Sequence, residues 1–298
     1  MKTRTFRLER PVHVGLTLGP LCRGRTDPTM RLTANEVWRA GRTPEGPATL
    51  HVSVDGDTAE ATAWGPGTQW ALDATPDLLG ASDDDAGFRP QHPVVAGLHR
   101  ELPGLRICRS RAVTEALVPT VLEQKVAGKE ARRSYTALVR RWGEPAPGPG
   151  DLLLPPSPEQ LRDLPYHAFH PLGVERRRAD IVRRVATVAR RLEETTSMPL
   201  DAAYRRLTAV PGVGTWSAAE VGLLALGDPD AVPVGDYGLP SLVTFALTGA
   251  RRGDDATMLE LLEPYHGHRG RVIRLLVAGG VGPARRAPRA PLRSIATI

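Results

Sequence analysis

Residues 207–240 read LTAVPGVGTWSAAEVGLLALGDPDAVPVGDYGLP, and this stretch decides the fold. Its residues 211–214, PGVG, separate two apolar segments and predict a tight turn between helices, the second of which spans 215–226. Glycines can adopt positive φ and carry no side chain, so backbone N–H groups at the start of the second helix can face an anion. The turn is interpreted either as a phosphate seat or as a plain connection between helices.

A carboxylate, Asp236, follows this turn in the segment VPVGDYG. It comes after an apolar run and stands next to glycines, where a partly desolvated side chain can face a ligand. A negative charge is out of place beside a phosphate-binding turn unless it acts on something positive. Asp236 is therefore the candidate catalytic residue.

These residues resemble the helix-hairpin-helix plus Gly/Pro-Asp signature of the base-excision DNA glycosylase superfamily, and within it the bacterial 3-methyladenine DNA glycosylase II type. In that branch the hairpin reads like PGxGxWTA, here residues 211–218, and the catalytic Asp follows, here Asp236. The resemblance extends from about Ile107 to Leu276. It implies an α+β protein with an N-terminal antiparallel sheet and helices (1–106), an all-α helix-hairpin-helix glycosylase body (107–282) and an Arg/Pro-rich tail (283–298).

The resemblance implies a DNA N-glycosylase that hydrolyses the N-glycosidic bond of alkylated purines, of the 3-methyladenine and 7-methylguanine type, in base excision repair. Such an enzyme extrudes the damaged base and then supports a sugar cation, which is the role expected of Asp236. Bifunctional relatives carry a Lys where this chain has Trp216, so no lyase activity is expected. A non-catalytic helix-hairpin-helix DNA-binding protein and an oxidised-purine glycosylase remain as alternatives.

Further site residues follow from the resemblance by position. The DNA-binding set is Gly212, Gly214, Thr215, Gln124 and Lys125. The last two lie in the tract VLEQKV (121–126), which resembles the family's ILxQQVS; Lys125 either fills the gap left by the extruded base or is an exposed helix end. Trp216 and Tyr237 would wall the base pocket, with core packing an equal alternative for Trp216.

No cofactor is required in the family. The main-chain carbonyls of Thr208, Val210 and Val213 are expected to hold a structural Na⁺ or K⁺ at the hairpin. The chain departs from the family pattern at Glu220, where relatives have an aromatic residue, and residues 272–276 carry no aromatic either. We therefore expect a wider or more polar pocket that accepts bulkier or cross-linked adducts.

The net charge and the number of cysteines limit which partners and which cellular compartment are expected. The net charge is +6; residues 1–107 carry 12 Lys/Arg against 13 Asp/Glu, and residues 108–298 carry 27 against 20. The basic excess lies with the hairpin, as expected for a monomer that binds double-stranded DNA containing damaged bases. Two cysteines, Cys22 and Cys108, form no zinc or iron-sulfur set by themselves. With no membrane-length apolar run and no signal-peptide core, we expect a cytoplasmic, nucleoid-associated protein.

Periodicity and turn residues predict the remaining elements. Strands are expected at 12–18, 37–40, 48–54 and 59–64, the last two joined by the hairpin turn at 55–57. Helices are expected at 75–79, 94–102, 112–142 with a break near Gly128, 161–164 after a Ser157 cap, 175–194, 241–247, 257–262 and 264–276. The Pro/Gly-rich segment 144–158 is expected to be a connector.

Several patterns allow a functional and a structural interpretation, and the structural one is favoured for each. Tryptophans 38, 64 and 70 are expected to pack in the core, Asp83 to Asp85 to form a solvated loop, and His167 and His170 to pack or lie at the surface. The arginines of 175–194 are expected mostly to face solvent, with one or two reaching phosphate. The tail 283–298 is expected to be disordered and to contact DNA through its charge.

Overall fold

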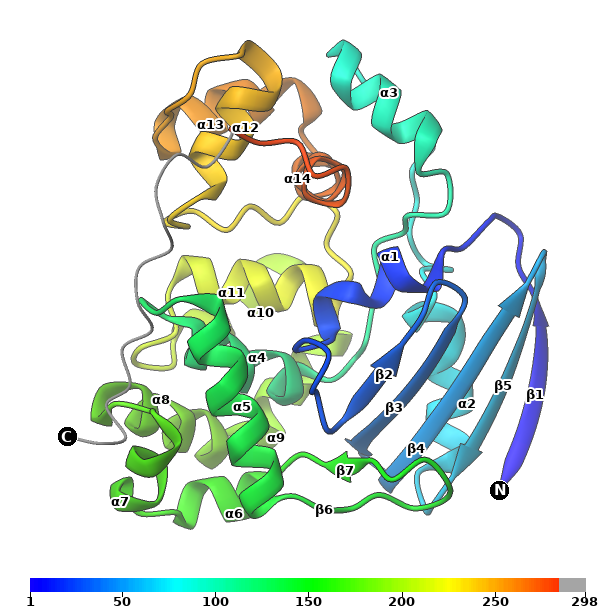
Figure 1. Ribbon diagram of the computed structural model, residues 1–298, viewed down its shortest axis with the longest axis vertical. Coiled ribbons are helices and arrows are strands. Elements are labelled where there is room, and N and C mark those ends of the chain that lie inside the picture. Colours follow the sequence, from blue (N-terminus) through cyan, green and yellow to red (C-terminus); the bar gives the residue numbers. More distant parts are fainter. Residues whose placement is uncertain (284–298) are drawn as a thin grey trace.

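An antiparallel sheet of five strands forms the N-terminal part of the computed structural model, which describes residues 1–283 (Figure 1). The strands are β1 Lys2–Arg7, β2 Met30–Leu32, β3 Glu36–Thr43, β4 Gly46–Asp55 and β5 Thr58–Trp64, in the order β1-β5-β4-β3-β2. The expectations for the tail concern residues that, apart from Pro283, lie outside the described range.

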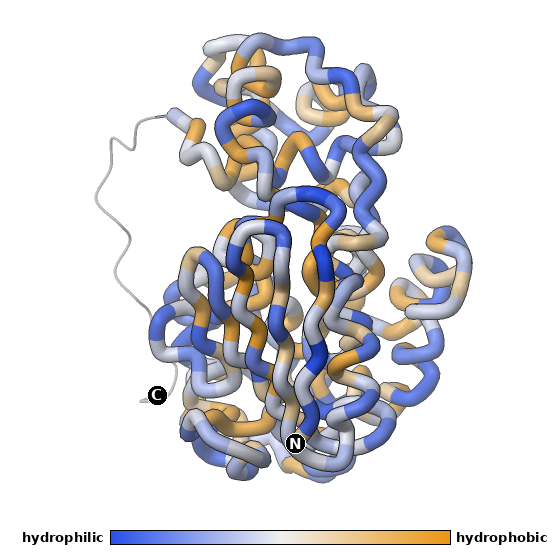
Figure 2. The backbone as a smooth tube through the Cα atoms, turned by 90° about the vertical axis from the view of Figure 1, so that its right-hand side faces the viewer, coloured by the Kyte–Doolittle hydropathy of each residue, from blue (hydrophilic) through white to orange (hydrophobic). Residues whose placement is uncertain are grey.

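Alternating side chains and one tight turn account for the centre of this sheet. Buried and exposed positions alternate along β5, and hydrophobic and hydrophilic residues alternate along the strands in Figure 2. Asp55 pairs with Thr58, so Gly56 and Asp57 form a two-residue loop, and Gly56 has φ +57°. Gly56 has a positive φ and Asp57 does not, which is the pattern of a II′ turn and confirms the predicted hairpin.

The predicted strand at 12–18 is wrong, because residues Val14–Leu18 form a short helix, α1, on one edge of the sheet. The apolar residues alternate locally, but the buried ones, Val14, Thr17 and Leu18, have the i, i+3, i+4 spacing of a helix. The His13 ring accepts a hydrogen bond from the Leu16 amide at 3.2 Å and caps the helix. Strands β1 and β2 were not predicted, since β1 is a polar edge strand and β2 has only three residues.

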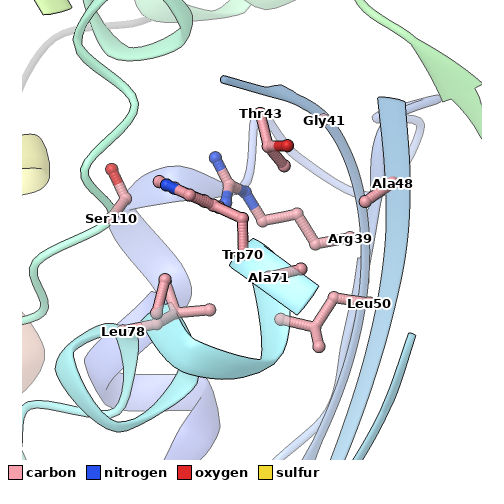
Figure 3. A pocket seen from close by; sticks show the side chains of 10 residues that line it. Arg39, Gly41, Thr43, Ala48, Leu50, Trp70, Ala71, Leu78 and Ser110 are labelled. Carbon is pink, nitrogen blue, oxygen red and sulfur yellow. The ribbon is translucent and has the colours of Figure 1, made fainter. Parts of the chain in front are cut away.

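Helix α2 Thr68–Leu78 packs on β4 and β5 and encloses the first apolar core together with α1. It begins earlier than the predicted helix at 75–79. Trp70 of this helix lines a cavity of about 30 Å³ between α2 and the sheet, beside Arg39 and Ser110 (Figure 3). That volume is room for a water molecule and not for a base.

The other two N-terminal tryptophans also pack within the protein. Trp38 stacks on His51 with ring centroids 4.1 Å apart and on Trp64 at 5.6 Å. The connector 144–158 passes over them, close enough that a Cβ at Gly148 would lie 2.4 Å from Trp64 Cγ. The connector contains the two-residue strands β6 Glu144–Pro145 and β7 Leu153–Leu154. Protein atoms thus occupy the faces that stacked bases would need.

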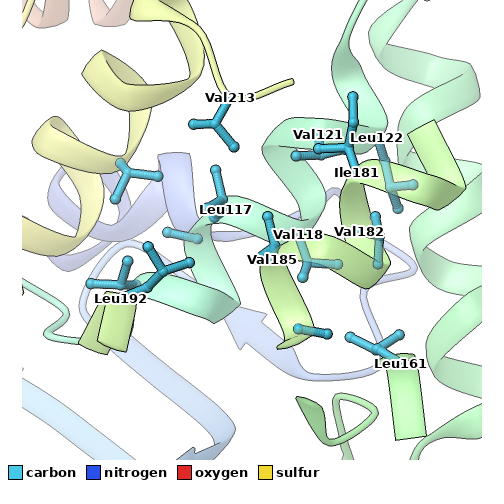
Figure 4. Packing of buried hydrophobic residues seen from close by; sticks show 14 of the residues in the cluster. Leu117, Val118, Val121, Leu122, Leu161, Ile181, Val182, Val185, Leu192 and Val213 are labelled. Atoms are coloured by element: carbon cyan, nitrogen blue, oxygen red, sulfur yellow. The ribbon is translucent and has the colours of Figure 1, made fainter. Parts of the chain in front are cut away.

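A helical bundle around the second apolar core carries the hairpin. Its helices are α4 Val113–Glu123, α5 Gly128–Trp142, α6 Pro158–Asp163, α7 Tyr166–Phe169, α8 Arg176–Thr187, α9 Ala189–Glu193, α10 Leu200–Thr208 and α11 Thr215–Val221. Figure 4 shows α4 and α8 facing each other through Leu117, Val121, Ile181 and Val185. Ser157 caps α6 in a capping box with Gln160, as its position before Pro158 predicts.

The predicted helix at 175–194 is interrupted at Val188, where α8 ends and α9 begins. Five of its seven arginines are exposed, as expected, but Arg178 is only 4% exposed. Its guanidinium donates to the Leu122 carbonyl at 2.7 Å and to the Gly173 carbonyl at 3.3 Å. A cation at the Leu122 carbonyl, in the last turn of α4, fixes the end of that helix, from which Gln124 and Lys125 project.

A third apolar core joins the C-terminal helices α12 Leu239–Thr248, α13 Asp255–Leu262 and α14 Arg269–Ala278 to α3 Pro93–Glu101. In Figure 1 these helices form one end of the molecule, with α14 turned toward α1 and α11. The solvated-loop expectation for Asp83 to Asp85 is wrong, because Asp83 is buried and forms a bidentate ion pair with Arg271 of α14, at 2.6 and 2.9 Å. Asp85 pairs with Arg10 and Arg106.

Residues 1–283 lack the features of a membrane-spanning helix and of a metal-binding cluster. No helix there is long and apolar enough to cross a membrane. Over the same residues, no group of three or more His, Cys, Asp or Glu side chains could hold a metal ion. His170 contacts the Tyr166 ring edge-on, which is the packing expected for it.

Candidate active site

The turn between α10 and α11 requires glycine at one of its two glycine positions. Gly212 has φ +98°, and a Cβ there would lie 2.4 Å from Ile181 Cγ1. Gly214 is extended, with φ −94°, and a Cβ there would meet nothing within 4 Å. The expected positive φ therefore holds for Gly212 only, and Gly214 keeps the start of α11 open.

Val213 anchors this turn to the bundle below it. Its side chain is 3% exposed and points into the second core in Figure 4. Its amide donates to the Val210 carbonyl at 2.9 Å. Gly214 and Thr215, by contrast, are exposed, and no side chain caps α11. The first amides of α11 thus lie at the surface of a turn that is fixed from inside.

Asp236 lies beside the hairpin although 20 residues separate it from Trp216. The Trp216 Nε1–H donates to Asp236 Oδ2 at 3.2 Å, and the amides of Gly238 and Leu239 donate to Oδ1 at 2.8 and 2.9 Å. Asp236 thereby caps α12 with one oxygen and meets the hairpin helix with the other. The Asp236 side chain is half-buried, and its hydrogen bonds hold both oxygens in place.

The polar loop GDPDA (227–231) fixes the path of the chain toward Asp236. Asp228 accepts a hydrogen bond from the Tyr204 hydroxyl of α10. Asp230 accepts from Arg269 Nε at 2.9 Å and Nη2 at 2.5 Å. Burial raises the pKa of the Asp230 carboxyl, but the hydrogen bonds and charge of Arg269 outweigh it and leave that pKa below its ordinary value. The loop is thus tied to both the hairpin and α14.

Gln124 and Lys125 lie at the end of α4, next to the turn. Gln124 Nε2 donates to the Gly212 carbonyl and to Ser217 Oγ, both at 3.0 Å. These bonds use both amide protons, so Gln124 ties α4 to the hairpin. Lys125 is exposed and has φ +58°, a conformation that costs a non-glycine residue on the order of 1 kcal/mol and is common at functional sites.

Of the two expected pocket aromatics, only Trp216 contacts Asp236. Trp216 is half-buried and belongs to none of the apolar clusters of residues 1–283, so core packing does not explain its position. Tyr237 is fully exposed at 104% and projects into solvent beside Asp236. A role for Tyr237 as a pocket wall remains a prediction.

The environment of Glu220 was not foreseen from the sequence. It lies one helical turn after Trp216 on α11, with Arg274 of α14 and Glu123 of α4 as charged neighbours. Burial, followed by the charges of Glu123 and Asp236, raises the pKa of the Glu220 carboxyl to about 7. The sequence contained one indication of these surroundings, because a glutamate one turn inside an apolar helix of the hairpin is unusual.

The three main-chain carbonyls expected to hold a monovalent cation are all in or before the turn. Val210 O accepts the Val213 amide, which leaves it one lone pair. The Thr208 hydroxyl donates a hydrogen bond to the Tyr204 carbonyl at 2.8 Å, so this side chain is not counted among the ligands. Backbone carbonyl oxygens are suitable ligands for Na⁺ or K⁺, and a monovalent cation at these three carbonyls remains a prediction.

Comparisons with known proteins find similarity to DNA repair enzymes. No family model matches it. A probable bifunctional transcriptional activator/DNA repair enzyme AlkA of Mycobacterium tuberculosis is 33% identical over 241 residues, which are 76% of this chain and 46% of that protein. The chain therefore spans about half the length of this relative.

Solved structures show the same architecture. A 3-methyladenine DNA glycosylase from Archaeoglobus fulgidus superposes with a TM-score of 0.76 at 18% identity, covering 92% of this chain and 97% of that one. An 8-oxoguanine glycosylase/lyase from Clostridium acetobutylicum, in complex with DNA, superposes with a TM-score of 0.62 at 14% identity. The superposition covers 83% of this chain and 95% of that one. The chain thus shares the fold of these two glycosylases, which confirms the expected α+β architecture.

Proposed function

We propose that this chain is a monofunctional DNA glycosylase that hydrolyses the N-glycosidic bond of alkylated purines, such as 3-methyladenine and 7-methylguanine, in base excision repair. The observation that carries the proposal is the position of Asp236: Trp216 of the hairpin helix and the first amides of α12 hold its carboxylate at the edge of the hairpin. The 33% identity to a DNA repair enzyme supports it.

Asp236 would act on the sugar of the extruded nucleotide. As the C1′–N bond lengthens, positive charge develops on the sugar ring, and a fixed carboxylate stabilises that charge more than it stabilises the neutral ground state. Oδ1 is occupied by two amides, so Oδ2 is the atom that would face the sugar and orient water. An alkylated purine carries its own positive charge, so it leaves without an added proton.

The hairpin would hold the DNA backbone. Gly212, Gly214 and Thr215 would bring main-chain N–H groups to a phosphate, because all three residues are exposed and the two glycines carry no side chain. A monovalent cation on the carbonyls of Thr208, Val210 and Val213 would add positive charge beside that phosphate. The cation would serve as a structural ion and would take no part in bond breaking.

Gln124 and Lys125 would meet the DNA where the damaged base has left the stack. Lys125 is the residue able to enter the gap, because Gln124 is engaged by the hairpin and Lys125 projects from a strained position at the end of α4. A lysine would fill the gap with a flexible stem and place its ammonium near phosphate. We propose double-stranded DNA with damaged bases as the partner of a monomeric, cytoplasmic and nucleoid-associated protein.

We further propose a division of labour between the parts of the chain. Residues 107–282 would form the glycosylase body, and residues 1–106 would support it through the sheet and its helices. The ion pair of Asp83 with Arg271 supports this assignment, because it ties the N-terminal part to the helix that follows the site. The tail 283–298 would add sequence-independent attraction to DNA.

The experiment that tests the activity is a cleavage assay on duplexes that carry 7-methylguanine or 8-oxoguanine, with and without alkali, combined with identification of the released base by mass. We expect release of 7-methylguanine and nicks only after alkali, because Trp216 occupies the position where a lyase needs an amine. Nicks without alkali would identify a lyase, and the 8-oxoguanine glycosylase/lyase of similar fold makes this the second candidate. Binding without any released base would identify a non-catalytic DNA-binding protein.

A further inference from the structure

The backbone that leads to Asp236 is tied to a helix later in the chain. The amides of Val234 and Asp236 donate to carbonyls within their own loop, at 2.9 and 3.3 Å. The amide between them, that of Gly235, donates instead to Asp255 Oδ1 at 3.1 Å. Asp255 is the first residue of α13 and lies 20 residues further along the chain. One hydrogen bond thus connects α13 to the residue directly before Asp236.

Gly235 is the point at which this loop is free to rotate. Its φ is +92°, a conformation that a residue with a Cβ rarely adopts. A Cβ there would meet nothing within 4 Å, so the backbone conformation, and not crowding, calls for glycine. Because Asp236 follows directly, a rotation of the Gly235 backbone would move the Asp236 carboxylate. The bond from Asp255 opposes that rotation.

The Asp255 side chain is available for this contact because its neighbour caps the helix. Asp254 is the N-cap of α13, and its Oδ1 accepts the Thr257 amide at 2.9 Å and the Thr257 hydroxyl at 2.8 Å. Asp255 is half-buried, and its Oδ1 points to the loop. Two consecutive aspartates therefore serve different ends: one completes α13, and the other bonds to a different segment.

Helix α13 is a firm support for the bond. Its residues Met258 and Leu262 are fully buried in the third apolar core. The helix also packs on α12, whose first amides donate to Asp236 Oδ1. Asp236 is thus held from two helices that pack together, by α12 after it in the chain and by α13 before it.

We propose that Asp255 is a positioning residue for Asp236: by fixing the Gly235 amide, it fixes the direction in which the Asp236 carboxylate faces the sugar. The inference rests on the proposed glycosylase activity. The Trp216 indole and the first amides of α12 hold the carboxylate itself, whereas Asp255 holds the backbone from which that side chain starts. A displacement of about 1 Å at a catalytic group can cost about 100-fold in rate. Loss of one support among several should cost less, about 10-fold.

The test separates the hydrogen bond from the charge of Asp255. Asp255→Ala removes the acceptor, and Asp255→Asn keeps an acceptor oxygen on a neutral side chain. In single-turnover release of 7-methylguanine at saturating protein, Asp255→Ala should be slower by about 10-fold and Asp255→Asn within about 2-fold of the wild type. The protein concentration that gives half the maximal rate should stay within about 2-fold in both, since the turn proposed to bind phosphate is unchanged. Equal rates in the two variants would overturn the inference.

A matched control variant excludes a general effect on helix stability. Asp201→Ala makes the same chemical change in the first turn of α10, where the side chain is exposed, and should release 7-methylguanine at the wild-type rate. An equal fall in Asp201→Ala and Asp255→Ala contradicts a positioning role, as does a fall that follows loss of folded protein in melting curves. Wild-type release with an unchanged rate in Asp255→Ala refutes the role of Asp255 alone, whereas no release by the wild type refutes the proposed function.

Discussion

The substitution Trp216→Phe isolates the contact that joins the hairpin to Asp236, the proposed catalytic carboxylate. It removes the indole N–H that donates to Asp236 Oδ2 at 3.2 Å and keeps an aromatic ring at the same place. A hydrogen bond to a charged group contributes about 1.5–3 kcal/mol when well shielded. Because both side chains are only half-buried, we expect about 1–1.5 kcal/mol here.

That free energy sets the size of the effect in a single-turnover assay of 7-methylguanine release. If it is lost from the transition state, the rate falls about 5- to 12-fold. DNA affinity should stay within about 2-fold, since the turn proposed to bind phosphate is unchanged, and the melting temperature should stay within about 3 °C.

A matched control is available at Trp142 of α5. Its indole nitrogen is buried, and no acceptor for it occurs in the described part of the chain, residues 1–283. Trp142→Phe makes the same chemical change without removing a hydrogen bond, so release should be unaltered and stability equal or slightly higher. A full rate in Trp216→Phe, or an equal loss in both variants, would refute the reasoning.

Two other substitutions test the frame around the site. Arg271→Met leaves Asp83 buried without its partner, so the free energy of unfolding should fall by about 3–5 kcal/mol in denaturant titrations; a change under about 1 kcal/mol would show that this pair does not hold α14 in place. Gly212→Ala should unfold more easily by at least about 1 kcal/mol and bind DNA more weakly, because its φ is positive and a Cβ would meet Ile181. Gly214→Ala should keep the fold, since space is open there, and equal stability of the two variants would contradict the geometry of the turn.

Residues that are close together in the sequence were enough to predict the hairpin and the part of the chain that leads to Asp236. Residues 211–214 encode the turn in glycine and proline, and the flanking apolar residues encode the two helices. The Asp55-Gly56 turn identified the central strands in the same way. Each of these features is decided by residues a few positions apart, which is why sequence alone predicts it.

Features that depend on distant partners escaped prediction. Asp83 looks like part of a solvated acidic run until Arg271, 188 residues away, pairs with it. Residues 12–18 alternate like a strand, but burial against the sheet selects a helix for Val14–Leu18. The pKa of Glu220 depends on charges from four segments that only the fold brings together. The composition of the chain and the spacing of its residues do not indicate which distant residues come into contact in the fold.

The central claim is that Asp236 performs the chemistry while the hairpin binds the DNA. The most direct test is release of 7-methylguanine by Asp236→Asn in single turnover, with binding measured on the same duplex. The amide oxygen can still accept the Gly238 and Leu239 amides, so the fold and the affinity should persist. Release should fall by at least about 100-fold. Release at the wild-type rate, or equal loss of release and binding, would contradict the account.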